Sequence, residues 1–157
     1  RNYYGNELPE KLDIIWQLNL GGGPTQVGAT LKHWSGAGWT GQPLMVKENG
    51  KKYLIQGAFD HRLKKIDAET GEVIWQYRFD DVVKGTGSLW LNHKADSLKD
   101  RIVILQGTRA GGMLASPIVD CYRGVSYFTG EELWRLNSPK TACYSRDVDG
   151  SALLIKD

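Results

Sequence analysis

The stretch IDAETGEVIWQYRF, residues Ile66–Phe79, decides how the rest of the chain is interpreted. From Val73 to Phe79 every second residue is apolar or aromatic, and this period of two is typical of a β-strand. The letters AETG ahead of that run end at Gly71, and glycine is the residue best suited to a positive φ angle in a turn. The stretch therefore predicts a tight turn followed by a strand.

Three segments of the chain share this pattern. They are LDIIWQLNL around Trp16, GEVIWQYRF around Trp75 and GEELWRLNS around Trp134. The first two tryptophans are 59 residues apart, and so are the last two. Equal spacing of this kind indicates a repeat architecture, such as a propeller, a solenoid or an array.

Each full repeat contains four short strands. Asn49-Gly50 between two apolar runs is the strongest short signal for a hairpin. In the first repeat we predict strands at Gly41–Glu48, Lys51–Gly57, Arg62–Asp67 and Val73–Phe79. In the second we predict strands at Ser88–Asn92, Arg101–Gly107, Tyr122–Phe128 and Glu132–Asn137, with Asn92–Asp100 as a long hairpin loop. Each repeat is thus expected to form an antiparallel meander.

Repeated four-stranded meanders predict an all-β fold of the β-propeller class, in which each meander is one blade. The 157 residues hold about 2.7 repeats, whereas propellers close with roughly 4–8 blades. We expect one propeller segment over 1–157, in which the ring is incomplete. Its parts are a terminal strand and inter-blade loop (12–40), a first full blade (41–79), a second full blade (86–138) and the start of a third (145–157). Either a longer protein or several copies of the chain would complete the ring.

With these residues in hand, a family resemblance can be stated. IDAETGEVIW resembles the tryptophan-docking motif of quinoprotein-like propellers, the PQQ-like repeat. The matching residues are Asp67, Thr70, Gly71 and Trp75 in the first copy, Thr129, Gly130 and Trp134 in the second, where Ser126 replaces the Asp, and Trp16 alone in the N-terminal copy. In that family the tryptophan packs on a neighbouring blade, so the resemblance implies a structural role for these residues.

The resembled family contains calcium- and pyrroloquinoline-quinone-dependent alcohol and sugar dehydrogenases, and also non-catalytic scaffolds of the bacterial outer membrane. This chain lacks the adjacent cysteine pair of the alcohol-oxidising enzymes, and no catalytic residue can be matched. We therefore expect a non-catalytic binding or scaffold module without a cofactor, in the periplasm or at the outer membrane. The alternatives are a fragment of a quinoprotein dehydrogenase that uses PQQ and calcium, and a carbohydrate-binding module. The expected partners are the remainder of the propeller or other copies of the chain, and a protein or glycan.

Loop lengths differ between the repeats chiefly at one end of the predicted blades. Loops on a rigid scaffold are the usual place for binding residues. The candidates at this end are Trp34, Trp39, Asp60, His61, Arg62, Arg109, Arg146 and Asp147.

Each candidate also has a structural interpretation. The tryptophans could stack on a sugar or a quinone, or fill the centre of the ring or a blade interface. Asp60 and His61 are adjacent, so their side chains are expected to diverge rather than to pair for acid–base chemistry. Arg146 and Asp147 begin the letters RDVDG, which resemble part of a calcium loop or form a turn.

Charge and cysteine content exclude several classes of function. The formal net charge is +2 and the basic residues are interspersed with acidic ones, which argues against nucleic acid as a partner. No apolar run approaches the ~20 residues that span a bilayer. The three histidines lack metal-ligand spacing, so no metal site is expected. Cys121 and Cys143 are either two small buried side chains or one disulfide.

Overall fold

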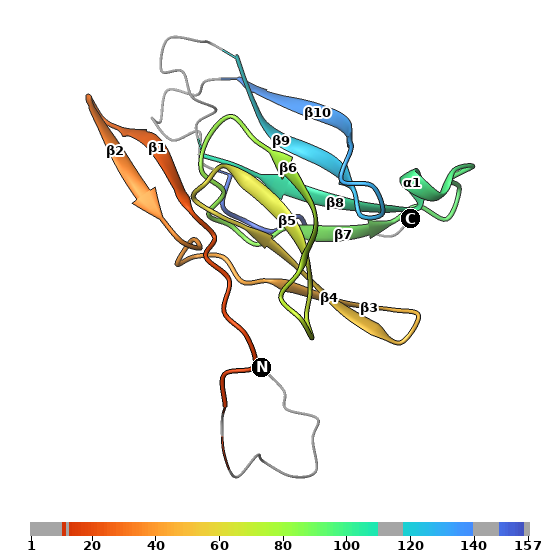
Figure 1. Cartoon of the computed structure of the whole chain (residues 1–157). Helices are drawn as coiled ribbons and strands as arrows, with labels where there is room; N and C mark the ends of the chain where they lie inside the picture. The colour runs from red at the N-terminus through yellow and green to blue at the C-terminus, as the bar shows by residue number, and fades with distance from the viewer. Residues whose placement is uncertain (1–10, 12, 110–117, 140–147, 156–157) are drawn as a thin grey trace.

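The computed structural model describes residue 11 and residues 13–109, 118–139 and 148–155. Its main body is two four-stranded antiparallel sheets, each a meander in which neighbouring strands follow one another along the chain (Figure 1). The first sheet contains β3 (Leu44–Glu48), β4 (Lys51–Gly57), β5 (Arg62–Asp67) and β6 (Val73–Arg78). The second contains β7 (Ser88–Leu91), β8 (Ile102–Gly107), β9 (Ile118–Ser126) and β10 (Glu132–Pro139).

The all-β prediction is confirmed, and the strands lie close to the ranges that the sequence indicates. One four-residue helix, α1 (Leu98–Arg101), stands at the end of the segment expected to be a long hairpin loop. Asn49 and Gly50 both adopt positive φ angles in the turn between β3 and β4, as a two-residue hairpin of this sequence requires.

The segment expected to be an inter-blade loop contains a further two-stranded hairpin. It consists of β1 (Gly22–Val27) and β2 (Thr30–Ser35), which Figure 1 shows projecting from one end of the two sheets. Gly28 has a φ angle of 59° in the turn that joins them. The glycine-rich sequence favoured a loop, but the chain pairs with itself over six residues on each side.

Two expected strands are absent from the part of the chain that the structure describes. Residues 13–20, around Trp16, form no strand, and neither do residues 148–155, where a third blade was predicted to start. A strand exists only through hydrogen bonds to a neighbouring strand. No described strand pairs with either segment, so the sequence pattern alone does not produce a strand there.

One hydrophobic core joins the two sheets. Buried side chains of β4 and β5 meet those of β8 and β9, and Phe79, which follows β6, belongs to the same cluster. The members of this cluster are Ile55, Leu63, Phe79, Val83, Ile104, Val125 and Tyr127. Because one face of each sheet is buried against the other, the two repeats form one packed unit (Figure 1).

The turns that precede β6 and β10 are nearly identical. Gly71 donates its backbone N–H to the Asp67 carbonyl at 2.9 Å, and Gly130 donates to the Ser126 carbonyl at 2.9 Å. The two glycines have φ angles of 78° and 73°. The side chain of Ser126 accepts a bond from the Thr129 N–H at 3.3 Å, so the serine performs part of the role of the aspartate.

The tryptophan contacts repeat with the same geometry. The Trp75 indole N–H donates to the Tyr127 carbonyl at 3.0 Å, and the Trp16 indole N–H donates to the Ala68 carbonyl at 2.9 Å. Donor and acceptor are 52 residues apart in both cases. Each ring also lies against the glycine of the next turn, where an added Cβ would stand 2.8 Å from the ring. Trp16 and Trp75 are therefore equivalent anchors on successive sheets.

Candidate functional site

The end of the molecule that carries the β1–β2 hairpin brings together most of the predicted site residues. The hairpin backbone lies over the β4–β5 connection: an added Cβ at Gly21 would stand 3.2 Å from the Asp60 side chain, and one at Gly23 would stand 2.7 Å from the His61 ring. Gly23 thus permits a close approach that a larger residue would prevent. We call the hairpin, the β4–β5 connection and the segment after β2 the hairpin end.

Arg109 and Trp34 fasten the hairpin to the two sheets. The Arg109 guanidinium follows β8, and its Nη1 donates to the Thr25 hydroxyl at 2.7 Å and to the Gln26 carbonyl. The guanidinium also lies 5.1 Å from the centre of the Trp34 ring, which packs 5.3 Å from the Phe59 ring. Both predicted site residues therefore hold the hairpin in place.

His61 is used in the same way. Its Nε2 is 2.8 Å from the Pro24 carbonyl and must carry the proton, because a carbonyl only accepts. The residue has a φ angle of 65°, a conformation in which histidine is several-fold enriched among non-glycine residues. Its side chain is buried against β1, so His61 positions the hairpin.

Asp60 is the centre of an ion cluster rather than a partner of His61. Its Oδ2 accepts from Lys64 Nζ at 2.6 Å and from Arg62 Nη1 at 3.3 Å, and its Oδ1 accepts from the Arg62 backbone N–H at 3.1 Å. Lys64 is buried in β5, and a buried charge needs a partner. The expectation that the adjacent Asp60 and His61 do not pair agrees with these contacts.

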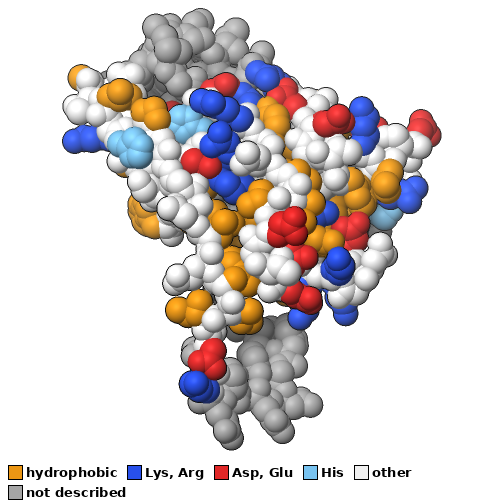
Figure 2. Space-filling model, viewed as in Figure 1, with side chains coloured by type: hydrophobic (Ala, Val, Ile, Leu, Met, Phe, Trp, Pro, Cys, Tyr) orange, Lys and Arg blue, Asp and Glu red, His pale blue; other side chains and the backbone are white. Residues whose placement is uncertain are grey.

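Positive charge remains at this end after these contacts are formed. Arg62 faces Arg78 directly across β5 and β6, and like charges in that position repel. Asp60 offers one negative charge to both Lys64 and Arg62. Figure 2 shows Lys and Arg side chains gathered beside the hairpin on this face of the molecule.

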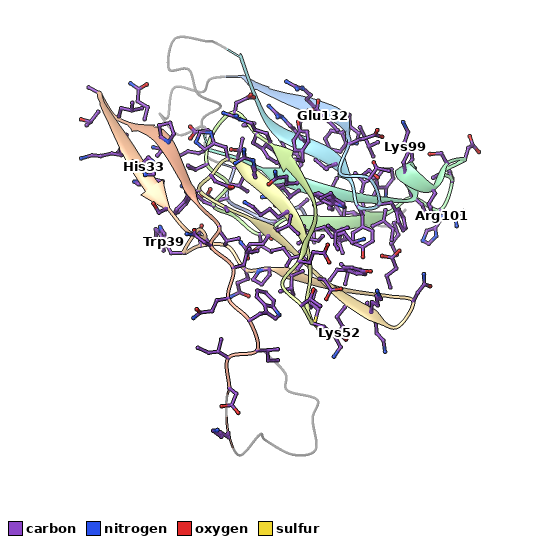
Figure 3. All side chains as sticks on the ribbon, viewed as in Figure 1. His33, Trp39, Lys52, Lys99, Arg101 and Glu132 are labelled. Atoms are coloured by element: carbon purple, nitrogen blue, oxygen red, sulfur yellow. The ribbon has the colours of Figure 1, made fainter. Side chains whose placement is uncertain are left out.

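Trp39 is the most exposed aromatic side chain of the hairpin end. Its side chain is 88% exposed, and Figure 3 shows it on the segment that follows β2, pointing away from the sheets. The backbone around it is held firmly: the Thr40 hydroxyl donates to the Lys84 carbonyl at 3.1 Å, and the Gln42 N–H donates to the Thr86 hydroxyl at 2.7 Å. An indole exposed on an anchored backbone is suited to stacking on a ligand.

An open groove lies on the outer face of the second sheet. Its volume is about 490 Å³, and its walls are Tyr122, Leu136 and the segment Val148–Ala152. The Tyr122 hydroxyl and the Asp149 Oδ1 are buried there without a hydrogen-bond partner among the described residues. Burial raises the pKa of the Tyr122 hydroxyl, so this group is a neutral donor at physiological pH.

The interface between the two sheets contains a polar network that sequence reasoning missed. Arg123 in β9 donates to Asp80 and, at 2.7 Å, to the Tyr77 hydroxyl; Tyr77 in turn donates to Glu132. Burial raises the pKa of Glu132, but hydrogen bonds from Arg135 and Tyr77 outweigh burial, and the net pKa is lowered. Arg123 is completely enclosed, so the network joins the sheets rather than a ligand.

The remaining predicted features are placed as follows. Arg146 and Asp147 lie outside the described residues, as does Cys143, while Cys121 is buried. Among the described residues no group of three His, Cys, Asp or Glu side chains could hold a metal ion. Within the same residues, no helix is long and apolar enough to cross a membrane.

Comparisons of the chain with family models, with curated proteins and with solved structures find no match.

Proposed function

We propose that the chain is a segment of a β-propeller that serves as a non-catalytic binding scaffold in a bacterial envelope protein. The propeller is supported by the equivalent contacts of Trp16 and Trp75. If each repeat contacts the next in the same way, successive sheets are related by the same rotation, and such sheets are arranged around an axis. The resemblance of the IDAETGEVIW stretch to PQQ-like repeats supports the same architecture and an extracytoplasmic location.

The observation that carries the binding role is the exposed indole of Trp39 on its anchored backbone. An aromatic ring of this size loses little conformational entropy on binding and offers a large flat contact area. The other aromatic candidate, Trp34, is committed to Phe59 and Arg109. We therefore assign ligand contact to Trp39 and scaffold support to Trp34.

A carbohydrate is the ligand class that this arrangement favours. The apolar face of a sugar ring can stack on the Trp39 indole, and Arg62 and Arg78, which face each other where β5 begins and β6 ends, offer donors to hydroxyl or carboxylate groups. A protein loop that presents an aromatic or acidic side chain is the alternative partner for the same surface.

A glycan array followed by calorimetry tests this proposal. We expect Trp39→Ala to weaken binding of the selected glycan by about 30-fold, corresponding to the ~2 kcal/mol of an aromatic hot spot. Leu31→Ala is the matched control, because Leu31 is an exposed apolar residue on β2 and should leave affinity unchanged. Binding that survives Trp39→Ala would refute the assignment, and silence across neutral and acidic glycans would remove the carbohydrate.

The same protein also tests the enzyme alternative. Reconstitution with PQQ and Ca²⁺, followed by dye-linked assays on alcohols and sugars, should give no turnover if the module only binds. Quinone-dependent oxidation above the rate of quinone alone would favour a dehydrogenase fragment.

A further inference from the structure

The N-terminal segment and β10 carry short sequences that differ at one residue of four. Residues Trp16–Asn19 read WQLN and residues Trp134–Asn137 read WRLN, two repeat lengths further along the chain. One of these segments has a docking surface within the structure, and the other presents its side chains to solvent.

The N-terminal copy occupies the outer face of the first sheet. The Trp16 indole is bonded to the Ala68 carbonyl and lies on Gly71. Leu18 and Leu20 lie beside it and enclose a cavity of about 130 Å³ with Leu54, Gln56, Ile66 and Pro43. Yet residues 13–20 form no strand. Side-chain packing and the indole hydrogen bond therefore hold this segment, together with one bond from Lys64 Nζ to the Leu20 carbonyl.

Among the described residues, the second copy, in β10, meets no turn like the one at Gly71, although the segment Val148–Ala152 borders the same face. Trp134 is 37% exposed and Leu136 is 58% exposed, and no described residue accepts from the Trp134 indole N–H. The groove of about 490 Å³ beside Leu136 also contains the unpartnered Tyr122 hydroxyl. This face corresponds to the face by which the first sheet packs on the second.

We propose that this open face binds the first sheet of a second copy of the chain once the Trp16 segment, which caps that surface within each copy, has been displaced. The inference rests on the repeat architecture proposed above. In each copy, the WQLN segment already binds the outer face of the first sheet at Gly71. This face is therefore a surface to which the similar WRLN segment of another copy can bind. On docking, Trp134 of one copy takes the place of Trp16 on the other.

The geometry of this contact makes assembly head to tail. The second sheet of one copy packs on the first sheet of the next, so the contact leaves a free surface at each end of a dimer. A head-to-tail assembly closes into a ring when the rotations between successive sheets add up to a full circle. With two sheets per copy, a ring of roughly 4–8 sheets would contain about 2–4 copies.

Measuring the molar mass of three proteins by light scattering tests the proposal. The wild-type chain should be a monomer, because Trp16 occupies the docking surface. The cap variant Trp16→Ala/Leu18→Ala should assemble into particles of about 2–4 copies. Adding Trp134→Ala/Leu136→Ala to the cap variant should restore the monomer.

A matched control uses the same segment of the chain. Ile14→Ala/Ile15→Ala removes two apolar side chains that are 76% and 84% exposed, and it should leave the wild-type protein monomeric. Assembly that persists in the four-substitution variant would overturn the proposal, and so would a folded cap variant that stays monomeric.

Circular dichroism establishes whether the cap variant is folded. If it is not, Trp16→Phe decides in its place, since phenylalanine keeps an aromatic ring on Gly71 but loses the N–H donor to Ala68. A mass that rises with concentration supports the cap, and a monomer at every concentration contradicts it. The mass measurement is independent of Trp39, so failure of this inference leaves ligand binding as a separate result.

Discussion

The same face of the repeat is buried in the first sheet and open in the second. Leu63 in β5 and Tyr77 in β6 pack against the second sheet, and Leu63 is completely buried. Their equivalents 59 residues later are Tyr122 and Leu136, which line an open groove. The strands, the turn and the tryptophan are alike in the two sheets, while the burial is not.

This difference distinguishes the structure that forms within one repeat from the burial that depends on the neighbouring repeat. Local hydrogen bonds form the turn and the meander within each repeat, and these are nearly identical in the two sheets. Burial of the outer face depends on another sheet, as expected for repeats that stack. How much a side chain contributes to the stability of the protein therefore depends on which repeat it lies in as well as on its residue type.

The largest test of the comparison uses the two equivalent tryptophans. Trp75→Ala removes a ring packed on Gly130 and a hydrogen bond to the Tyr127 carbonyl, and should lower the free energy of unfolding by about 3–5 kcal/mol. Trp134→Ala should cost about 1 kcal/mol or less, because that indole is partly exposed and has no described acceptor. Denaturant unfolding of the monomer measures both.

The proposed difference between the two sheets is contradicted if Trp75→Ala and Trp134→Ala lower the free energy of unfolding by the same amount. Equal and large costs would mean that Trp134 already has a partner in solution. In that case the measurement should be repeated at several protein concentrations, since a bound second copy makes stability depend on concentration.

A smaller test places a methyl group beneath each tryptophan. Gly130→Ala puts a Cβ 2.8 Å from the Trp75 ring at a φ angle of 73°, and should cost about 2 kcal/mol or more, since the left-handed conformation alone costs roughly 1–2. Gly124→Ala meets the Trp134 ring at 2.3 Å, but that ring can turn towards solvent. We expect Gly124→Ala to cost clearly less in the same unfolding experiment; the reverse order would show that Trp134 is held as firmly as Trp75.

Sequence patterns predicted the meanders well because the signals are local. Alternating apolar residues, Asn49-Gly50 and the glycines at the two turns each act within a few residues, and the strands begin and end near the expected positions. The prediction of a strand around Trp16 was wrong for a physical reason: its side chains have the right pattern and contacts, but the described residues give it no neighbouring backbone to pair with.

Features that depend on distant residues were not predictable. The Arg123 network needs Asp80, which is 43 residues away and in the other repeat. Nothing in the local sequence around Arg123 distinguishes it from a surface residue of a strand. The hairpin end shows the same limit, because Trp34 and Trp39 look alike in the sequence. Only the packing of Phe59 and Arg109 distinguishes the half-buried Trp34 ring from the exposed Trp39 ring.

The smallest test compares the two turns, which differ by one charge. The backbone N–H groups of Glu69 and Thr70 donate to the Asp67 carboxylate and lower its pKa, whereas Ser126 in the second turn carries no charge. A lowered pKa in the folded state stabilises the protein above the unfolded value of about 3.9, and this contribution is lost as the pH falls through the folded pKa. Asp67→Asn keeps an acceptor oxygen without the charge. The difference in unfolding free energy between wild type and Asp67→Asn should thus be small, present at neutral pH, and vanish in acid. The difference in unfolding free energy between wild type and Ser126→Ala should stay constant over the same pH range. If the difference for Asp67→Asn is also constant, the charge of Asp67 contributes nothing to the stability of the first turn.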